Sequence, residues 1–227
     1  MKYEVHTGSL LVAEPFMQDS NFRRAVILVT DHAEDEGTVG FIINKPLTVS
    51  ITELVEDFPQ IEAPAYYGGP VSTNTIHYIH NVGLLLDGST EIAPGVFWGG
   101  EFEKLKFLIS QDLIKSENIR FFVGYSGWSP GQLIEELDAS SWITAEAHAN
   151  YVFKSKPSRL WNQVMHHKGD VYSVLAQLPE QPNHLKNIPL DNSHEPLCKP
   201  CVYGGIFAIP CSLPISTQLT FQGSSFY

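Results

Sequence analysis

The chain has 227 residues, and 43% of them are hydrophobic, which suits one folded domain with a sizeable core and excludes wholesale disorder. Its 14 basic and 25 acidic residues give a net charge of −11, so direct nucleic-acid binding is not expected. No stretch approaches the roughly 20 apolar residues that span a bilayer, and the N-terminal sequence lacks the apolar segment of a signal peptide. We therefore expect a cytoplasmic protein with no membrane association.

The first third of the chain carries strand and turn signals. The β-branched run at 25–30 and the sequence 38–44 predict two strands joined by an exposed acidic turn, either as a hairpin or as two neighbouring strands. Ser50, with Glu53 three residues later, forms the pattern of a capping box. This pattern predicts a helix over 50–58.

The middle of the chain mixes both kinds of element. A glycine-rich turn at 66–71 leads into a predicted strand at 75–81. Apolar residues recur at helical spacing over 101–116, with Leu113 on the apolar face, which predicts a helix. The apolar run at 119–127 predicts another buried strand.

The sequence 158–168 predicts an amphipathic helix that ends at Gly169. Its inward residues are Leu160, Trp161, Val164 and Met165. Because helices and strands mix without strict alternation, the pattern predicts an α+β fold rather than a doubly wound sheet.

The last part of the chain differs in composition. Residues 188–227 contain only three charged residues and five prolines, and no helical period is present. We therefore divide the chain into a domain at 1–187 and a tail at 188–227 that is expected to be poorly ordered.

The sequence GYSGW raises the question of a nucleophilic serine. It resembles the nucleophile elbow of hydrolases, except that Trp128 stands where the second glycine should be, so Ser126 is a weak candidate nucleophile. Ser129 with Gln132 forms a capping-box pattern, and Pro130 suits the first position of a helix. The alternative prediction is therefore a tight strand-to-helix turn.

Two pairs of histidines are candidate metal ligands. His77 and His80 would point to opposite faces of a strand, so they cannot easily share one ion. His166 and His167 lie at the polar end of a predicted helix, where histidine also suits the helix dipole. We predict surface or half-buried histidines and no cofactor.

All three cysteines lie in the tail, where a zinc site is conceivable. His194, Cys198, Cys201 and Cys211 supply the donors of a Cys₃His site, although the spacing before Cys211 is short. The alternative is an accessory extension without a metal or redox role.

Five motifs occur in an order that points to a known family. They are GSLLVAEP (8–15), FRRAVILVTDH (22–32), GTVGFIINKPL (37–47), YYGGPV (66–71) and VGYSGWSPGQLIEEL (123–137). In these motifs the chain resembles the AlgH/YqgE family of small bacterial proteins. Its N-terminal sequence and its length resemble those of members from the Bacteroides group.

The resemblance implies a fold but no reaction. It implies a compact α+β domain whose branched β-sheet curls into a partial barrel with helices around it, in a cytosolic protein. The family has no agreed biochemical activity, and one branch is named for regulating alginate synthesis genes, hence the label of transcriptional regulator. The family-motif residues that are polar or shaped for a pocket are Asn44, Lys45, Gly68, Gly69, Tyr125, Trp128 and Gln132. They are candidate ligand-binding residues, and the alternative role is turn formation and packing.

Three functions remain open. The first is a non-enzymatic binding or regulatory protein that acts through a protein partner or a small ligand. The second is an enzyme that uses a cleft near Tyr125, Trp128 and Asn44, with Lys45 or a histidine as acid or base. The third is a zinc or redox switch in the tail.

Overall fold

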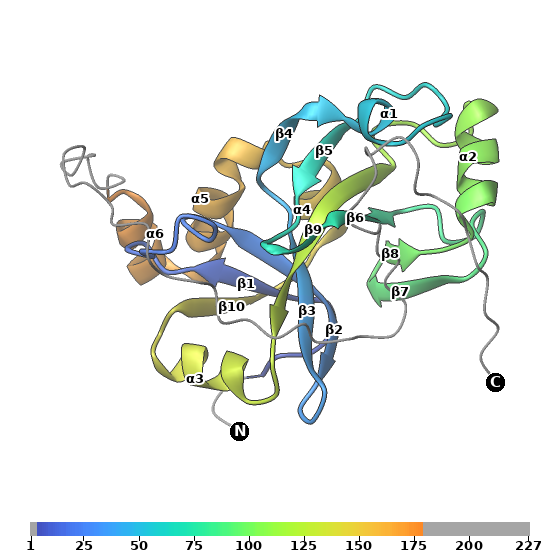
Figure 1. The fold of residues 1–227 in the computed structure, drawn as a ribbon. Helices are drawn as coiled ribbons and strands as arrows, with labels where there is room; N and C mark the ends of the chain where they lie inside the picture. The colour runs from blue at the N-terminus through green and yellow to red at the C-terminus, as the bar shows by residue number, and fades with distance from the viewer. Residues whose placement is uncertain (1–3, 179–227) are drawn as a thin grey trace, which may run out of the picture.

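The structure is a computed structural model that describes residues 4–178. The predicted tail and the boundary near 187 lie outside the described residues. The described chain forms ten strands and six helices (Figure 1). The strands are β1 (Ser9–Ala13), β2 (Val26–Ala33), β3 (Gly37–Ile42), β4 (Pro46–Ser50), β5 (Pro64–Tyr67), β6 (Val71–His80), β7 (Ser89–Ala93), β8 (Val96–Gly99), β9 (Ile119–Trp128) and β10 (Trp142–Glu146). The helices are α1 (Ile51–Leu54), α2 (Phe102–Ser110), α3 (Gln132–Asp138), α4 (Ala149–Phe153), α5 (Pro157–Lys168) and α6 (Asp170–Ala176).

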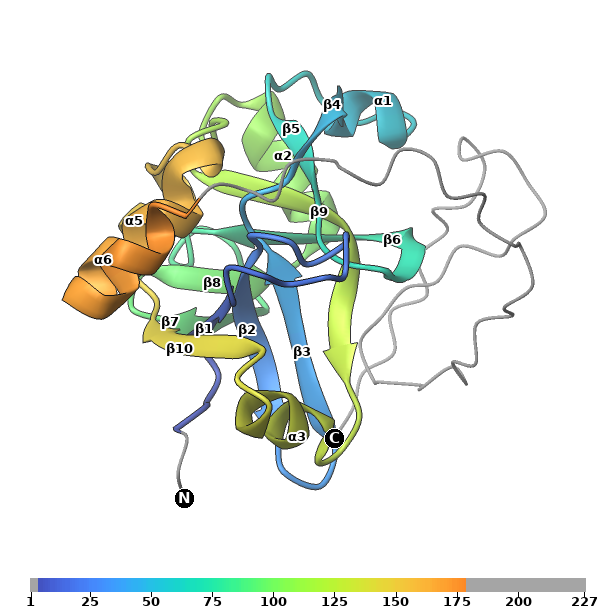
Figure 2. The same cartoon turned by 90° about the vertical axis from the view of Figure 1, so that its left-hand side faces the viewer.

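The sheet branches at β9. The main strand order is β10-β1-β2-β3-β9-β6-β8-β7, with β4 paired to β5 and β5 paired to β9. The first half of β9 pairs with β5 at Phe121–Val123, and the second half pairs with β3 at Ser126–Trp128. Figure 2 shows β9 as the long strand that runs from the β4–β5 end of the molecule to the end near α3. The predicted α+β fold with a branched, partly barrel-like sheet is confirmed.

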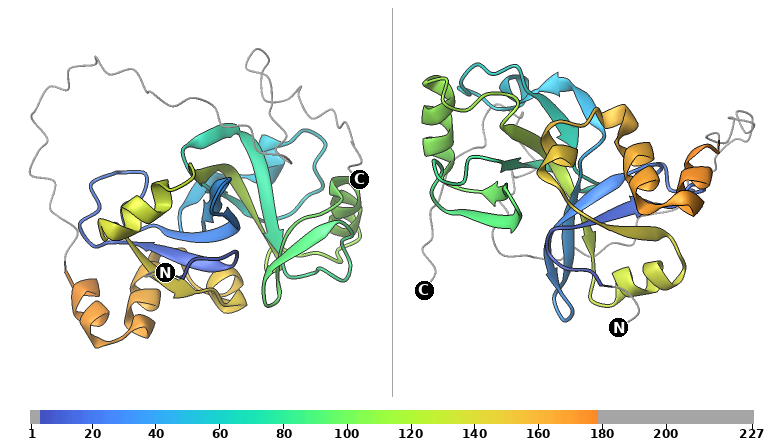
Figure 3. Two further views of the ribbon diagram at one scale, coloured as in Figure 1. Left: turned by 90° about the horizontal axis from the view of Figure 1, so that it is seen from below. Right: turned by 180° about the vertical axis from the view of Figure 1, so that it is seen from behind.

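Helices cover the sheet on several sides and bury three apolar clusters. Helices α4 and α5 pack on the face of β1 and β2 that carries Leu10 and Leu28, whereas α3 packs on the opposite face, beside Leu11 and Ile27. The view from below shows α3 and α5 on opposite sides of these strands (Figure 3). The third cluster lies around α2 and includes Phe121 of β9. Each cluster therefore contains a residue of β9: Phe122 in the first, Trp128 in the second and Phe121 in the third.

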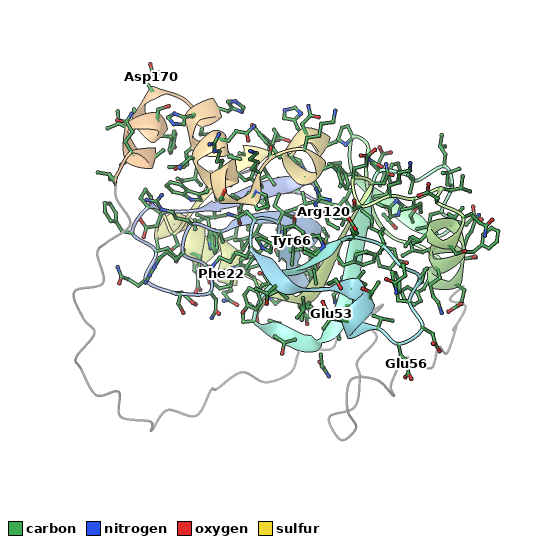
Figure 4. All side chains as sticks on the ribbon, turned by 90° about the horizontal axis from the view of Figure 1, so that it is seen from above. Phe22, Glu53, Glu56, Tyr66, Arg120 and Asp170 are labelled. Carbon is green, nitrogen blue, oxygen red and sulfur yellow. The ribbon has the colours of Figure 1, made fainter. Side chains whose placement is uncertain are left out.

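Arg120 links this strand to the helices. Its guanidinium donates to the backbone oxygens of Ser116 and Phe153 at 2.8 Å each, and it lies 5.8 Å from the ring centre of Tyr66. Figure 4 shows Arg120 and Tyr66 side by side near the middle of the molecule. Among the helices of residues 4–178, none has the length and apolarity that crossing a membrane requires.

Several predicted elements are confirmed. Strands β2 and β3 form the expected antiparallel hairpin, and β6 includes most of the strand predicted at 75–81. Helix α5 buries all four residues predicted to face inward, and Gly169 caps its C-terminus. The capping box of Ser50 and Glu53 is present at the start of α1.

Two helices end earlier than predicted. Helix α1 ends at Leu54 because Val55 is extended, although Phe58 remains buried. Helix α2 ends at Ser110, where Asp112 adopts a left-handed conformation with φ of 56°. The N–H groups of Asp112 and Leu113 bond back to the oxygens of Ile109 and Leu108, as in a Schellman motif. Leu113 was expected on the apolar face, but it is 56% exposed.

Candidate functional site

The branch of the sheet depends on close backbone contacts between glycines. A Cβ on Gly68 would lie 2.1 Å from the oxygen of Gly124, and one on Gly69 would lie 2.3 Å from the backbone of Tyr125. Gly124 has φ of 66°, and its Cβ would lie 2.7 Å from the oxygens of Gly69 and Val71. The YYGGPV and VGYSGW motifs are therefore adjacent in space, and their glycines permit that contact.

Gly124 also changes the direction in which Tyr125 points. Residues three apart on a regular strand face opposite sides, yet Phe122 and Tyr125 belong to the same core cluster. The left-handed conformation of Gly124 interrupts the alternation between them. As a result, Tyr125 faces the same side of the sheet as His77, whose ring centre lies 6.0 Å away.

Opposite Gly124, strand β6 contains a bulge of four residues. Val71 pairs with Tyr125 and Ile76 pairs with Val123, so residues 72–75 stand opposite Gly124 alone. Ser72 in this bulge has φ of 46°, which is unusual for a residue with a side chain. Bulges of this kind re-aim side chains and occur often beside functional sites.

The bulge fixes the orientation of His77. The Thr75 hydroxyl donates to the Ser72 oxygen at 2.7 Å and lies 3.0 Å from His77 Nε2. Because the single hydroxyl proton is already used, Thr75 accepts a hydrogen bond from His77 Nε2–H. His77 Nδ1 then carries the lone pair of a neutral imidazole.

His77 is a buried residue, contrary to the prediction of a surface or half-buried histidine. It is 8% exposed, and its ring lies 5.1 Å from that of Phe41. Burial lowers its pKa from 6.5 to about 4, because the protonated imidazole would lose its hydration. The prediction was wrong because periodicity treats histidine as polar, whereas a neutral imidazole packs against aromatic rings.

Two polar atoms in this region have no partner among the described residues. Neither His77 Nδ1 nor the Tyr125 hydroxyl makes a hydrogen bond with residues 4–178, although Tyr125 is only 4% exposed. Neither atom is among the fully buried polar atoms that lack a partner, so both keep some contact with solvent. Both atoms therefore lie beside buried aromatic rings, on side chains that are 8% and 4% exposed.

Ser126 does not lie in a nucleophile elbow. It is an interior residue of β9, where it pairs with Gly40, and its side chain is fully buried. Its hydroxyl donates to the Gly68 oxygen at 3.1 Å. A serine nucleophile needs access to substrate and an adjacent base, and this arrangement provides neither. The predicted strand-to-helix turn begins only after Trp128.

Trp128 and Gln132 belong to a separate network around Glu136. The indole N–H groups of Trp128 and Trp142 donate to Glu136 Oε2 at 2.9 and 2.6 Å. The Gln132 amide donates to Glu136 Oε1 at 3.0 Å, and Phe22 stacks on Trp128. Sequence reasoning missed Glu136, although its spacing of four residues from Gln132 on a predicted helix was a usable signal.

The start of α3 differs from the prediction. The helix begins at Gln132 with Gly131 as its N-cap, so Pro130 is not a helical residue. Half of the expected capping box is present, since the Ser129 N–H donates to Gln132 Oε1 at 3.0 Å. Gly131 adopts a left-handed conformation with φ of 80°, which is not helical, so the helix starts only at the next residue.

Asn44 and Lys45 hold loops rather than facing Tyr125. The Asn44 amide accepts from Val26 N–H and donates to the Arg24 oxygen, each at 2.9 Å. Lys45 Nζ donates to the Asn21 oxygen at 2.7 Å. The structure therefore brings Gly68, Gly69 and Tyr125 together, and the Lys45 backbone oxygen accepts from Tyr67 N–H next to them. The side chains of Asn44 and Lys45 bond to other segments, and Trp128 and Gln132 bond to Glu136.

The other histidines that the structure describes are not grouped into a metal centre. His80 is fully buried; its Nε2–H donates to the Gly99 oxygen at 2.9 Å, and its Nδ1 accepts from Val82 N–H. Burial lowers its pKa, and the bond to Gly99 opposes this only in part. His167 bonds to the Tyr151 hydroxyl, and His166 is exposed. Within residues 4–178 no three His, Cys, Asp or Glu side chains are grouped as a metal site requires.

The candidate tail site lies outside the described residues. This applies to His194 and to Cys198, Cys201 and Cys211. Their proposed zinc or redox role therefore stays a prediction.

Comparison with known proteins places the chain in a family. A model described as AlgH-like matches residues 10–173. The chain belongs to the AlgH-like family. It is 41% identical to a UPF0301 protein of Chlorobium phaeobacteroides over 179 residues, which cover 79% of the chain and 95% of that relative. Identity to a UPF0301 protein of Chlorobaculum tepidum is 43% over 175 residues, which cover 77% and 93% of the two chains.

Solved structures agree with the fold of this AlgH-like chain. The solution structure of the AlgH protein from Pseudomonas aeruginosa matches with a TM-score of 0.61 at 27% identity and covers 79% of this chain and 98% of that one. Protein DIP2367 from Corynebacterium diphtheriae matches with a TM-score of 0.63 at 24% identity, over 78% and 94% of the two chains. The resemblance inferred from the five motifs is confirmed.

Proposed function

We propose that this AlgH-like chain is a cytosolic binding protein that acts through a small ligand or a protein partner rather than an enzyme. The proposal rests on the hydrogen bonds that the reactive side chains of the family motifs make. The Ser126 hydroxyl, the Asn44 amide and the Lys45 ammonium all hydrogen-bond to backbone oxygens of neighbouring segments. Side chains engaged in this way support the branched sheet and are poorly placed for acid–base or nucleophilic chemistry.

Any regulatory role would follow from binding a partner. The net charge of −11 opposes contact with the phosphate backbone of DNA. A transcriptional effect would then pass through another protein or through a ligand-dependent change in affinity for one.

Native mass spectrometry of the freshly purified full chain tests the proposal. We expect a non-covalent companion, either a small molecule or a protein, whose mass disappears after denaturation. A pull-down from the source cells complements the experiment where the chain is bare. A zinc adduct that is lost in Cys198→Ser would favour the tail switch instead.

An enzymatic role would contradict the proposal. The decisive result would be turnover in a hydrolase and transferase screen that disappears in Lys45→Ala or Ser126→Ala while the variants remain folded. The control is Lys154→Ala, which changes a lysine outside the family motifs.

A further inference from the structure

We propose that His77 and Tyr125 form the polar end of a binding site for a small neutral molecule that carries an N–H or O–H donor on a planar apolar body. The proposal rests on the proposed binding function and names the site and the class of ligand. It is carried by two unused polar atoms on side chains that are 8% and 4% exposed.

The required donor follows from the tautomer of His77. Its Nε2–H is committed to Thr75, which in turn donates to the Ser72 oxygen, so Nδ1 presents only a lone pair. A ligand that brings an N–H or O–H group can pair with this atom, and the Tyr125 hydroxyl can donate to or accept from the same ligand.

The planar apolar body follows from the surrounding rings. The His77 ring is flanked by Phe41 at 5.1 Å and by Tyr125 at 6.0 Å between ring centres. Phe41 is fully buried, whereas Trp98, whose ring centre lies 6.3 Å from that of Phe41, is only partly buried, so Trp98 is the ring of this group that a ligand could reach. Flat rings of this kind bind planar molecules by stacking or edge contacts.

The ligand is expected to be uncharged. The pKa of His77 is lowered to about 4, so the imidazole carries no charge at neutral pH and offers no attraction to an anion. Ordinary binding sites combine such an apolar lining with a few placed polar groups.

The backbone beside His77 and Tyr125 is irregular and strained, as is common at binding sites. The bulge at 72–75 and the left-handed Gly124 together place His77 and Tyr125 on one side of the sheet. Ser72 holds an unfavourable φ of 46° in the bulge, where its oxygen anchors Thr75. Strained residues of this kind concentrate at binding and catalytic sites.

The test uses the full chain labelled with ¹⁵N and two matched probes, phenol and anisole. Phenol carries a hydroxyl donor, whereas anisole has the same ring without a donor. We expect phenol to shift the imidazole ¹⁵N signal of His77 and the amide signals of residues 72–77. Anisole should bind at least about tenfold more weakly, which is the effect of losing one hydrogen bond of about 1.4 kcal/mol.

Three variants separate the site from general effects. His77→Phe should abolish the difference between phenol and anisole, and Tyr125→Phe, which removes only a hydroxyl, should weaken phenol several-fold. His32→Phe is the matched control, because His32 also bonds to a threonine, with 2.7 Å between its Nδ1 and Thr38 Oγ1, but lies on β2. It should bind phenol as the parent does.

Defined results would overturn the site. They are equal binding of phenol and anisole, shifts that fall outside residues 72–77 and Tyr125, or phenol binding that is unchanged in Tyr125→Phe. If His77→Phe fails to fold, Tyr125→Phe still decides. A companion found by native mass spectrometry and retained in Tyr125→Phe and His77→Phe would reject this site while leaving the binding function intact. A bare chain without a partner would reject the binding function itself.

Discussion

Gly124 sets the direction of Tyr125, and its surroundings leave no room for a side chain. We expect Gly124→Ala to lower the free energy of unfolding by at least about 2 kcal/mol, because the left-handed conformation alone costs an L-residue about 1–2 kcal/mol. The added Cβ would also meet two backbone oxygens at 2.7 Å. Urea unfolding of the variant and the parent measures the difference.

Gly131→Ala is the matched control for this prediction. Gly131 has a similar φ of 80°, but a Cβ there would meet nothing within 4 Å. It should lose only the conformational part, about 1 kcal/mol. Equal losses in the two variants would show that the close contact at Gly124 is unimportant.

The buried His77 predicts a specific dependence of stability on pH. The unfolded chain binds a proton at this residue below its ordinary pKa of 6.5, whereas the folded chain does so only near 4. The contribution of the neutral His77 to the free energy of unfolding is therefore fully present above pH 6.5. It is lost as the pH falls towards 4, by about 3 kcal/mol in total. Within the described part of the chain, the side chains that contact the His77 ring are those of Thr75, Phe41 and Tyr125, so no Asp, Glu, Lys or Arg is among them.

His77→Gln removes this proton uptake and provides the measurement. Between pH 7 and pH 5, the parent should lose about 2 kcal/mol more unfolding free energy than His77→Gln does. His80 is present in both chains, so its own acid sensitivity cancels. Identical pH profiles would mean that His77 is protonated at its ordinary pKa and is more hydrated than the geometry indicates.

Glu136 connects helix α3 to the sheet through hydrogen bonds to Trp128 of β9 and Trp142 of β10. Its carboxylate accepts from Trp128, Trp142 and Gln132, and Gln in its place would turn an NH₂ group towards one of these donors. We expect Glu136→Gln to lower the free energy of unfolding by about 1–3 kcal/mol. The neighbouring Glu135→Gln should change it by less than about 0.5 kcal/mol, because Glu135 is exposed.

Tryptophan fluorescence gives a local readout of the same change. Loss of the two indole hydrogen bonds should shift the emission in Glu136→Gln but not in Glu135→Gln. Equal stability of the two variants would mean that packing of Leu133 and Leu137 alone holds α3 in place.

The elements that were predictable are those with a strong local pattern. The amphipathic sequence of α5 and the β-branched run of β2 are dictated by burial on one face or on both. The ends of α1 and α2 were not predictable, because α1 stops where Val55 becomes extended and α2 stops before Asp112, a non-glycine residue with a positive φ. The residue types at these positions do not reveal such conformations, because propensity is only a weak guide to where a helix ends.

The candidate site was predictable only in part. The motifs singled out Gly68, Gly69 and Tyr125 as candidate ligand-binding residues; the structure places them in close backbone contact, and their ligand-binding role stays a prediction. His77 was missed, since its partner Thr75 and its aromatic neighbours become adjacent only through the bulge of β6 and the turn at Gly124. Such pairings join segments about 50 residues apart and leave no local periodicity.

For the whole molecule, the family match predicts where an independently stable unit ends. The AlgH-like model stops at residue 173, and the Chlorobium relative is covered over 95% of its length by 179 residues of this chain. A chain of residues 1–187 should therefore keep the urea midpoint of the full chain. A chain of residues 1–168 should be less stable, because it lacks α6 with its packed Tyr172 and Leu175. A lower midpoint for 1–187 would place the later residues within the stable unit.

The net charge of the whole molecule bears on whether the chain can bind DNA directly. A protein that binds duplex DNA without sequence preference typically does so with Kd of about 10⁻⁴–10⁻⁶ M, through cations that replace counterions on the phosphates. With a net charge of −11, the full chain is expected to give no change in the anisotropy of a labelled 30-base-pair duplex at ~100 µM protein and ~50 mM salt, conditions that favour such contacts. Binding that weakens steeply as salt is raised would reveal a basic surface that the net charge conceals. Binding that ignores salt would point to contacts other than phosphate. Either result would make DNA a direct ligand, whereas an unchanged signal leaves a protein or small-molecule partner as the route to any regulatory effect.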